Sequence, residues 1–481
     1  MASAPTTRSP PAAGSWCRAA SRRSWRPPTD VAVRASAVRH AVAARGAAWQ
    51  VRGCAVGLAV SSRLDPGTSV KADTIVLGAG IVGVSIAIHL AMRGRSVVLV
   101  DRRPPGEETS YGNSGVVGRS GVLPMSFPRS FSQFARVVRQ RYPGARYHAT
   151  ALPGLAPWLY AYWRASEPSR MTESARRLAP LLASAVDEHA YLAGLAGAEH
   201  FYRDGGWMKV YRSEAAFAAA RAQVETAKAH GVVVEVLDAA ETLAAEPHLA
   251  PIVRGATLWT QLRSVSDPGG VVKTTAALLP RYDARFVSGD ARSLRPDGRS
   301  WSVDTAEGVV TASSAVVALG PWSLDVLRPL GYRLPLAVKR GYHMHYGAAG
   351  NATLGRPVLD EERGYVITPM AKGIRLTTGS EFARRDAPPS PVQLEVAERD
   401  AGELFPLAGR REAAPWMGFR PCFPDMRPVV GAAPRHPGLW LAFGHQHSGF
   451  TLGPPTGRLL AELMTGGDTF VDPAPFDPAR F

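Results

Sequence analysis

Three closely spaced glycines open the part of the sequence whose residue types best suit ligand chemistry. Gly78, Gly80 and Gly83 form a G-x-G-x-x-G motif, and Asp101 follows 23 positions after the first of them. At this spacing the glycines permit a tight turn, let the backbone approach a pyrophosphate and allow close helix–strand contact. A carboxylate at Asp101 can accept hydrogen bonds from the hydroxyls of an adenosine ribose. The motif therefore predicts a dinucleotide site.

The surrounding residues predict the elements that must position this motif. Residues 73–77 form a short apolar run, residues 81–93 carry an apolar stripe at helical spacing, and residues 96–100 form a second apolar run that ends in Asp101. A strand, a glycine-rich turn, a helix and a second strand make a βαβ unit, in which the motif has its proper setting. The residues that we expect to contact the nucleotide here are Gly78, Ala79, Gly80, Ile81, Val82, Gly83, Asp101 and Arg102.

A second glycine-rich loop follows at residues 102–115. It carries small hydroxyl and amide side chains, which suit a further approach to a pyrophosphate or to the edge of a flat ring. A plain surface turn is the alternative interpretation. The residues that we expect to contact a cofactor are Thr109, Ser110, Asn113, Ser114 and Gly115.

Here the chain resembles the D-amino acid oxidase superfamily of flavoproteins, and most closely its D-amino acid dehydrogenase branch. The resemblance rests on the 109–115 loop and on three further segments, 316–323, 416–431 and 444–457, in the same order and spacing. It covers about residues 73 to 466 and implies FAD, bound non-covalently, as the cofactor. It also implies cofactor contacts beyond the first motif, at Ala291, Gly320, Trp322, Gly449, Phe450, Thr451 and Leu452.

The last of these segments has a physical meaning of its own. Pro454 and Pro455 stand where a helix is expected to start, because proline is tolerated in a first helical turn. The backbone N–H groups of residues 449–452 are then free to stabilise negative charge on a flavin ring.

The cysteines exclude other redox chemistry. Cys17 and Cys54 precede the first motif, only Cys422 follows it, and no C-x-x-C pair or second G-x-G-x-x-G occurs. We therefore expect no metal site, no redox disulfide and no separate nicotinamide site, so that reducing equivalents come from the organic substrate. Cys422 as a covalent flavin anchor is disfavoured, because the sarcosine oxidase relatives place such a cysteine differently.

The pattern predicts an α/β fold: a Rossmann-type FAD-binding domain with an inserted substrate domain built on a mixed β-sheet with helices. We assign residues 70–130, 265–330 and 415–470 to the FAD-binding domain and 471–481 to a C-terminal tail. Residues 131–264, largely helical, and 331–414, which alternate as strands, form the substrate domain. Within them we expect helices at 173–197 and 213–230 and strands at 232–237, 337–346, 364–369 and 373–380.

The buried carboxylate of an amino acid substrate needs a paired cation, preferably a guanidinium that binds it through two hydrogen bonds. We assign this role to Arg420, which resembles the carboxylate-binding arginine of glycine oxidase, although an arginine that bonds backbone carbonyls is the alternative. His447 stands where that relative has a second arginine, and it is a pocket wall or a loop histidine. Tyr342, His343 and Tyr365 are candidate hydrogen-bond partners of the substrate, or core residues. Arg375 and Glu381 match the dehydrogenase branch, but a cross-strand ion pair explains them equally well.

Charge is unevenly distributed along the chain. The net charge is +16, and residues 1–69 hold ten arginines against only Asp30 and Asp65. This Arg- and Ala-rich extension is expected to be disordered: a mis-assigned start, a transit-like peptide or a basic arm. Its longest apolar stretch, residues 53–60, is too short to span a bilayer. We expect a cytoplasmic protein with no transmembrane segment and no nucleic-acid partner, and peripheral contact with the inner membrane stays open.

The function that we predict is FAD-dependent oxidative deamination of a small D-amino acid, by hydride transfer from Cα to flavin N5. The imine so formed hydrolyses to a keto acid and ammonia, and the electron acceptor is O2 or a membrane quinone. An oxidase or dehydrogenase of a secondary amine, of the glycine, sarcosine or hydroxyproline type, is the first alternative. A nucleic-acid-binding flavoprotein with structural FAD, suggested by the basic pI, is an alternative of another class, and a nicotinamide-linked dehydrogenase is a distant third.

Overall fold

The computed structural model of the protein describes residues 70–481, except 123–124, 141 and 230–231. The predicted extension 1–69 therefore lies outside the described residues, and its expected disorder is not tested. No helix in the described part of the chain is both long and apolar enough to cross a membrane.

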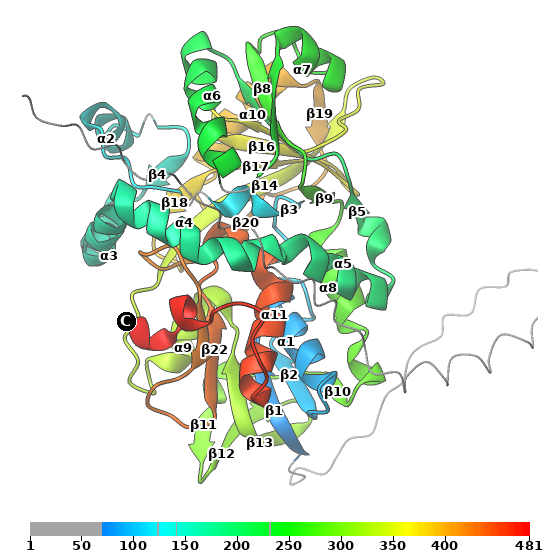
Figure 1. Cartoon of the computed structure of the whole chain (residues 1–481), viewed down its shortest axis with the longest axis vertical. Helices are drawn as coiled ribbons and strands as arrows, with labels where there is room; N and C mark the ends of the chain where they lie inside the picture. The colour runs from blue at the N-terminus through cyan, green and yellow to red at the C-terminus, as the bar shows by residue number, and fades with distance from the viewer. Residues whose placement is uncertain (1–69, 123–124, 141, 230–231) are drawn as a thin grey trace, which may run out of the picture. The chain divides into compact units, whose positions relative to one another are not determined.

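The first sheet has eight strands and carries the glycine motif at one end (lower part of Figure 1). Five strands run parallel in the order β10, β2, β1, β13 and β22, and the central ones, β2 and the second half of β1, are apolar and buried on both faces. Helices α1 (Ile81–Ala91) and α11 (Gly449–Thr465) pack against one face and against each other. The strands are β1 (Val70–Leu77), β2 (Val97–Asp101), β10 (Ala284–Ser288), β11 (Arg295–Asp297), β12 (Ser300–Thr305), β13 (Gly308–Val317), β21 (Val429–Ala432) and β22 (Leu439–Phe443).

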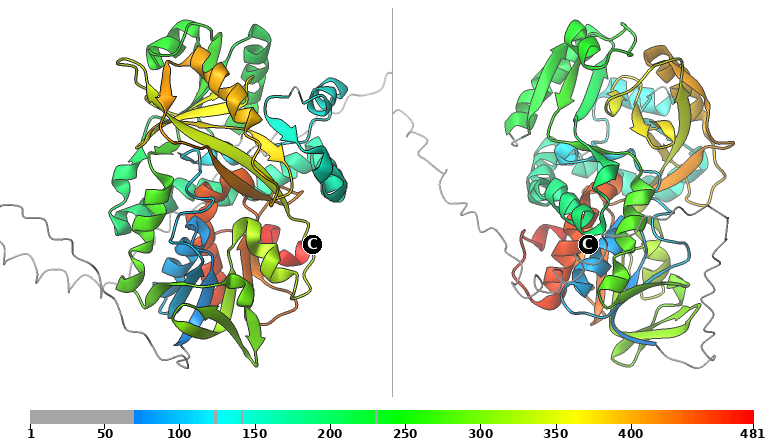
Figure 2. Two further views of the ribbon diagram at one scale, coloured as in Figure 1. Left: turned by 180° about the vertical axis from the view of Figure 1, so that it is seen from behind. Right: turned by 90° about the vertical axis from the view of Figure 1, so that its right-hand side faces the viewer.

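The second sheet has eleven strands and forms a roof, which the view from behind in Figure 2 shows above the first sheet. Its longest strand, β14, pairs with four other strands, β17, β18, β19 and β20, all antiparallel. Beyond β17 the sheet continues through β16, β15, β6, β8 and β7, and beyond β18 it continues through β4. The strands are β4 (Ala145–Tyr147), β6 (Trp207–Tyr211), β7 (Val234–Asp238), β8 (Gly255–Trp259), β14 (Ala337–Ala348), β15 (Val358–Asp360), β16 (Tyr365–Met370), β17 (Gly373–Thr377), β18 (Ser380–Phe382), β19 (Leu407–Arg410) and β20 (Trp416–Cys422).

Helices and a small sheet complete the described chain. A three-stranded sheet joins β3 (Val116–Val117), β9 (Arg263–Val265) and β5 (Tyr202–Arg203). Helices α4 and α5 run across the middle of Figure 1 and both contact α11. The other helices are α2 (Phe131–Val138), α3 (Leu152–Ala165), α4 (Pro168–Ala183), α5 (Ala185–Ala196), α6 (Glu214–Ala229), α7 (Ala239–Ala245), α8 (Pro268–Ala276), α9 (Ser323–Leu327) and α10 (Val392–Leu404).

The predicted fold class is confirmed, and the differences are local. The helix expected at 173–197 is two helices, because the chain turns at Ser184 between α4 and α5. The strand expected at 373–380 is likewise interrupted, so that β18 begins at Ser380.

Two differences concern the predicted domain boundaries. Strand β20, which we grouped with the FAD-binding segments, pairs with β14 and so extends the roof sheet. Residues 471–481, predicted as a tail, pack on the first sheet: Phe476 is buried and Arg480 forms an ion pair with Asp425 at 2.9 Å. The domain assignment as a whole otherwise stays a prediction.

Candidate active site

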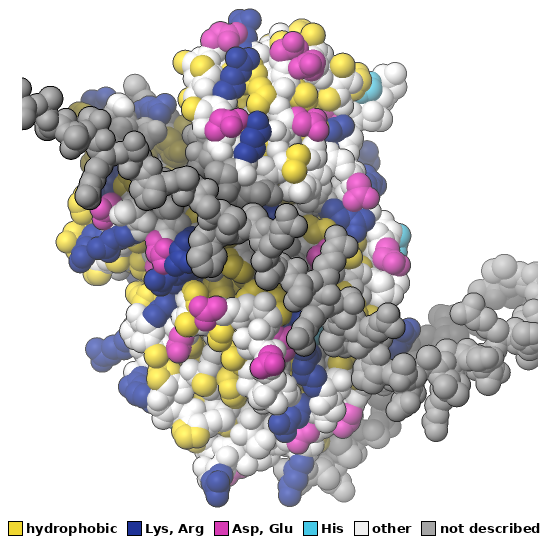
Figure 3. Space-filling model, in the orientation of Figure 1, with side chains coloured by type: hydrophobic (Ala, Val, Ile, Leu, Met, Phe, Trp, Pro, Cys, Tyr) yellow, Lys and Arg dark blue, Asp and Glu magenta, His cyan; other side chains and the backbone are white. Residues whose placement is uncertain are grey.

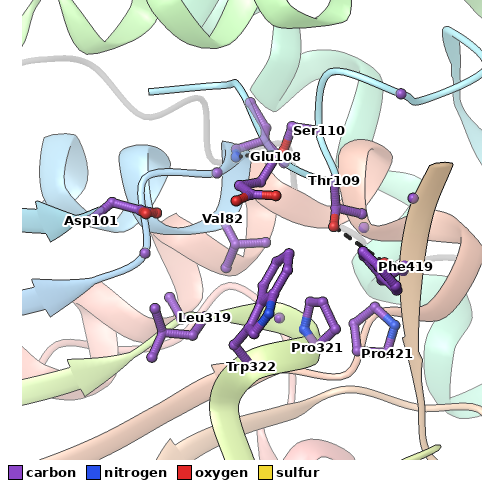
Figure 4. A pocket seen from close by; sticks show the side chains of 18 of the residues that line it. Val82, Asp101, Glu108, Thr109, Ser110, Leu319, Pro321, Trp322, Phe419 and Pro421 are labelled. Atoms are coloured by element: carbon purple, nitrogen blue, oxygen red, sulfur yellow. Dashed lines mark hydrogen bonds between the residues drawn. The ribbon is translucent and has the colours of Figure 1, made fainter. Parts of the chain in front are cut away.

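A cavity of about 800 Å³ lies where the ends of the parallel strands meet the roof sheet. The glycine motif, the 108–114 loop, the turn after β13 and strand β20 all contribute to its wall. Figure 4 shows part of this wall, with Asp101 at one side, Phe419 and Pro421 at the other, and Trp322 between them. Segments more than 300 positions apart in the chain therefore face one cavity.

The glycine turn is shaped to hold a phosphate group. A Cβ atom at Gly83 would lie 1.8 Å from the carbonyl oxygen of Gly78, so no side chain is tolerated there. Gly80 caps α1 without any side-chain hydrogen bond, and the first turn of α1 carries no acid. The positive end of the helix dipole is thus left for an anion in the cavity.

Asp101 ends β2 beside this turn. Its Oδ2 accepts a hydrogen bond from the Ala79 N–H at 2.7 Å, and its Oδ1 accepts one from the Arg103 N–H at 3.2 Å. The carboxylate is held at the cavity wall by these two bonds. It is positioned as the motif predicts for an acid that contacts a ribose.

The second loop is tied to the first motif and to the roof. Ser110 Oγ accepts a hydrogen bond from the Ile81 N–H at 3.0 Å, and Thr109 Oγ1 donates one to the Phe419 carbonyl at 3.2 Å, the dashed line in Figure 4. Arg102 lies 4.7 Å over the Trp322 ring. The glycine turn, the second loop and strand β20 are therefore in contact in the structure, whereas the sequence shows only their order along the chain.

Helix α11 begins earlier than predicted. It starts at Gly449, so that Pro454 and Pro455 lie inside it rather than at its start. Because these prolines lack an N–H, the carbonyls of Phe450 and Thr451, four positions earlier, lose their helical partners.

A buried histidine supplies the missing donors. His189 Nε2 lies 3.0 Å from the Phe450 oxygen and 3.2 Å from the Thr451 oxygen, and its Nδ1 lies 2.8 Å from the Tyr202 hydroxyl. Burial lowers the pKa of His189 to about 4, so the ring is neutral, with its proton on Nε2. The helix can thus begin early and direct its N-terminus toward the cavity.

Most of the predicted cofactor contacts line this cavity. Ala79, Gly83 and Gly115 do not line it, but shape the backbone that does. Thr451 and Leu452 line a second cavity instead, described next. Those in the wall of the first are Gly78, Gly80, Ile81, Val82, Asp101, Arg102, Thr109, Ser110, Asn113, Ser114, Ala291, Gly320, Trp322, Gly449 and Phe450.

The second cavity measures about 890 Å³ and adjoins the first. It extends from the start of α11 toward α2, α6 and β6. We call the residues that line both cavities the junction: Asn113, Ser114, Thr377, Arg420, His445, Gln446 and His447. The junction contains Arg420 and His447, two of the five residues predicted to contact the substrate.

Arg420 lies on β20, opposite Lys339 of β14. Its Nη1 donates to the Gly379 carbonyl at 2.7 Å and its Nη2 donates to the Thr378 carbonyl at 3.1 Å. Burial lowers the pKa of Arg420 from its ordinary value. The carbonyls are neutral, so these bonds orient the guanidinium without balancing its charge.

His447 lies beside Arg420, with its Nε2 3.3 Å from Ser380 Oγ. Burial, and then the neighbouring positive charges of Arg420 and Lys339, lower the pKa of His447 well below its ordinary value. The ring is therefore neutral near pH 7 and adds hydrogen-bonding capacity, but no second positive charge, at the junction.

Tyr342 lines the first cavity, but its hydroxyl is engaged elsewhere. The hydroxyl donates to Glu381 at 2.9 Å and accepts from the Ser390 N–H at 2.8 Å. Glu381 is also paired with Arg340 at 2.6 Å. The expected hydrogen bond from Tyr342 to a substrate is therefore not supported, because a buried ion pair holds its hydroxyl.

His343 and Tyr365 line neither cavity, which corrects their predicted role. His343 is buried, with its ring stacked on Trp416 at 4.8 Å. The Tyr365 hydroxyl lies 3.2 Å from Asp360 and 3.1 Å from the Asp400 carbonyl, in the core of the roof. Both side chains are on strands whose alternation the sequence shows, but the face that points toward the cavity depends on the sheet packing.

The alternative interpretation of Arg375 and Glu381, a cross-strand ion pair, is wrong, because each has other partners. Arg375 Nη1 donates to the carbonyls of Tyr111 at 2.9 Å and Asn113 at 2.5 Å, and its Nε donates to His345 at 3.0 Å. His345 in turn contacts Glu412 at 2.5 Å. The roof thus holds the second glycine-rich loop through a buried cation.

Several wall residues were missed from the sequence. Thr377, His445, Gln446 and Trp416 line one or both cavities, and Arg385, paired with Asp325 at 2.8 Å, closes the first. Trp416 had a visible signal, because it stands just before the G-x-R-P segment that supplied Arg420.

The site that the described residues form holds neither a metal-binding cluster nor a cysteine. The described residues contain no group of three or more His, Cys, Asp or Glu side chains that could hold a metal ion. Cys422 is buried, with its thiol 3.4 Å from the Arg420 carbonyl, and it lines neither cavity.

Comparison with known proteins identifies the class. Residues 73–463 match the family of FAD dependent oxidoreductases, and the chain belongs to that family. It is 34% identical over 425 residues to a D-amino acid dehydrogenase of Ralstonia nicotianae, covering 84% of this chain and 99% of the relative. It is 30% identical to a D-amino-acid oxidase of Bradyrhizobium diazoefficiens, covering 84% of this chain and 98% of the relative.

Solved structures share the fold. A glycine oxidase from Geobacillus kaustophilus aligns with a TM-score of 0.65 at 22% identity, covering 86% of this chain and all of that one. An L-proline dehydrogenase from P. horikoshii aligns with a TM-score of 0.63 at 18% identity, covering 86% and 98%.

FAD, the cofactor of the family, fits the residues present. The start of α1, whose first turn carries no acid, and the acid at the end of β2 meet in one cavity large enough for a dinucleotide, beside the glycine whose Cβ the backbone excludes. The start of α11 faces the same cavity through Gly449 and Phe450. The protein is an FAD-dependent oxidoreductase.

Proposed function

We propose that the protein catalyses the oxidative deamination of a D-amino acid to a keto acid and ammonia. The observation that carries this proposal is the place of Arg420, at the junction of the cofactor cavity and the second cavity. Relatives of the chain that are named D-amino acid dehydrogenase and D-amino-acid oxidase, at 30% to 34% identity, support the choice of substrate.

Arg420 binds the substrate carboxylate in this proposal. A carboxylate at the junction supplies the negative charge that the carbonyls of Thr378 and Gly379 cannot supply. Neutral His447 and Ser380 offer hydrogen bonds beside it. The carboxylate fixes one end of the amino acid, so that its Cα–H is oriented toward the first cavity.

Bound FAD supplies the chemistry, by accepting the hydride that leaves Cα as the imine forms. Among the described residues, those of the junction include no Asp or Glu, so no carboxylate is placed there as a base. The substrate therefore reacts with a neutral amine, whose proton is lost to solvent before the hydride leaves. The start of α11 stabilises the negative charge that the reduced cofactor acquires.

The electron acceptor and the location complete the proposal. O2 and a membrane quinone are both compatible with the proposed reaction, and oxidation of the reduced protein in stopped flow, by oxygen or by a soluble quinone, distinguishes them. We propose a cytoplasmic enzyme with peripheral contact with the inner membrane.

The test is the Arg420→Ala variant. We expect KM for D-alanine to rise about 150-fold, from about 3 kcal/mol of lost charge-assisted hydrogen bonding. The ratio of kcat/KM for D-alanine to kcat/KM for the corresponding amine without a carboxylate is expected to fall sharply. Loss of an arginine with only a structural role would lower both values and leave their ratio unchanged. Arg410→Ala, which breaks the pair with Glu398 near the surface, is the matched control. An unchanged KM, with FAD still bound, would remove Arg420 from the site.

A further inference from the structure

Large apolar side chains are exposed mainly in one part of the described chain. Six of the eleven that are exposed lie between residues 125 and 163, and Phe131 is the most exposed at 86%. Exposed apolar side chains are common singly, but a group of them marks an interaction surface. We call this group the apolar face: Met125, Phe131, Phe134, Val138, Tyr160 and Trp163.

Helices α2 and α3 carry this face together. Phe131, Phe134 and Val138 follow each other at helical spacing on α2, which has no buried residue. Phe127 links the two helices, because its ring lies 6.3 Å from Phe134 of α2 and 5.8 Å from Tyr162 of α3.

The exposed side of α3 continues the face. The rings of Tyr160 and Trp163 stack at 6.1 Å, and both are exposed. Arg129, just before α2, lies 4.8 Å over the Trp163 ring and donates to the Trp163 carbonyl at 2.9 Å. The face is therefore continuous across the two helices.

The segment that carries the apolar face has basic but no acidic residues of its own. The sequence contains no Asp or Glu from Met125 to Ser166, and the next acid, Glu167, is paired with Arg170 at 3.3 Å. Four exposed arginines border the face. Figure 3 shows dark blue basic side chains beside yellow apolar ones over α2 and α3, at its left edge. The arginines are Arg129, Arg136, Arg139 and Arg164.

We propose that the apolar face docks on the surface of an anionic lipid bilayer. Aromatic rings with a polar edge and arginines suit the boundary between headgroups and acyl chains, where anionic lipids attract the cations. The N-terminal 69 residues carry a net charge of +8 from ten arginines and two acids, so their charge does not complement this face.

The second cavity gives the docking a consequence, which rests on the proposed function. Met125 of the apolar face, and Gln133 and Arg136 of α2, line this cavity, as the junction residues do. An oxidant dissolved in the bilayer can enter there and travel toward Arg420 and the flavin end of the first cavity. The electron acceptor is then a lipid-borne quinone, which takes up two electrons and two protons.

Cosedimentation of the full chain with vesicles tests the docking. We expect binding to phosphatidylcholine vesicles that contain about 30% phosphatidylglycerol, and much weaker binding to pure phosphatidylcholine. The double variant Phe131→Ser/Phe134→Ser is expected to lower the partition coefficient at least tenfold. Ile252→Ser/Val392→Ser, which removes two exposed apolar residues elsewhere, is the matched control and is expected to bind as wild type does.

Three outcomes would overturn the docking proposal. The first is that the wild type does not bind anionic vesicles. The second is that the Phe131/Phe134 variant binds as well as the wild type, which would assign the binding to the basic N-terminal residues. The third is that the variant changes only the oligomeric state, from a dimer of this chain to a monomer.

Turnover of D-alanine with a water-soluble dye is the separate control for the proposed function. If the dye activity is retained in both variants while reduction of a quinone in the vesicles falls only in the Phe131/Phe134 variant, the lipid-borne acceptor is supported. An equal quinone rate in both would overturn that acceptor.

Discussion

The two sides of the cofactor cavity are built in different ways. On the side of the first sheet, backbone atoms of residues close in sequence shape the wall, as where Gly83 leaves no room for a Cβ beside the Gly78 carbonyl. On the roof side, charged side chains reach across the fold, as where Arg375 bonds carbonyls more than 260 positions earlier. The first side is intolerant of any added atom, whereas the second depends on buried charge.

The largest effect is expected from Gly83→Ala on the first side. The new Cβ would lie 1.8 Å from the Gly78 oxygen, so the turn must open or α1 must shift. We expect at least a ~1000-fold loss of FAD affinity, because overpacking against rigid backbone costs several kcal/mol. Titration of the apoprotein with FAD, followed by fluorescence, measures this loss.

Gly402→Ala is the matched control for that variant. Gly402 lies in α10 with nothing within 4 Å of the position of a Cβ. Alanine there is expected to leave FAD binding unchanged and to raise stability by about 0.5 kcal/mol. An FAD affinity for Gly83→Ala equal to that of Gly402→Ala would contradict the importance of the backbone on this side.

On the roof side, Arg375→Met is expected to weaken FAD binding about 100-fold, because removing one partner from a buried polar network costs several kcal/mol. The carbonyls of Tyr111 and Asn113 lose their donor, and the loop that lines the cavity is released. The same titration measures the effect. Arg375→Lys keeps the charge but cannot reach both carbonyls and His345 at once, so only partial recovery is expected.

Arg410→Met, at the partly exposed pair with Glu398, is the control for Arg375. An exposed pair contributes little, so its FAD affinity is expected to change less than about twofold. Equal affinities for the two methionine variants would show that the roof does not hold the loop.

This difference between the two sides explains what the sequence could predict. The glycine motif, its strands and its terminal acid all lie between Val70 and Asp101, so their spacing alone defines a local geometry. The roles of Tyr342, His343 and Tyr365 depend on which face of β14 and β16 points toward the cavity. They also depend on which side chains from other strands form hydrogen bonds with these residues. Arg375 gave one signal, a charge within an otherwise apolar strand, but its partners on the distant loop could not be read from β17 itself.

The start of α11 offers a smaller effect that depends on pH. In His189→Leu, the carbonyls of Phe450 and Thr451 lose their donor, which costs about 2 kcal/mol of stability at pH 7. In the unfolded chain His189 takes up a proton below pH 6.5, while in the folded chain its pKa is lowered to about 4. The stability of the wild type is therefore lost as the pH falls from about 7 toward 4, by about 1.4 kcal/mol per pH unit for this histidine.

Denaturant unfolding of both proteins at several pH values between 7 and 5 checks the sign. We expect the slope of unfolding free energy against pH to be smaller in His189→Leu, because this variant lacks the proton that the unfolded wild type binds at His189. It does not vanish, because burial also lowers the pKa of His89 and His445, each to about 3. Identical slopes in the two proteins would mean that folding does not lower the pKa of His189.

The smallest effect is expected from Tyr365→Phe, which separates the roof core from the site. The hydroxyl bonds Asp360 and the Asp400 carbonyl and accepts from Arg212 at 3.2 Å, so its loss costs about 1 to 2 kcal/mol of stability. Because Tyr365 lines neither cavity, KM and kcat for D-alanine are expected to stay within about twofold of the wild type, where a substrate contact would cost roughly tenfold. Steady-state kinetics beside a melting curve measure both, and a tenfold rise in KM without loss of stability would return Tyr365 to the substrate.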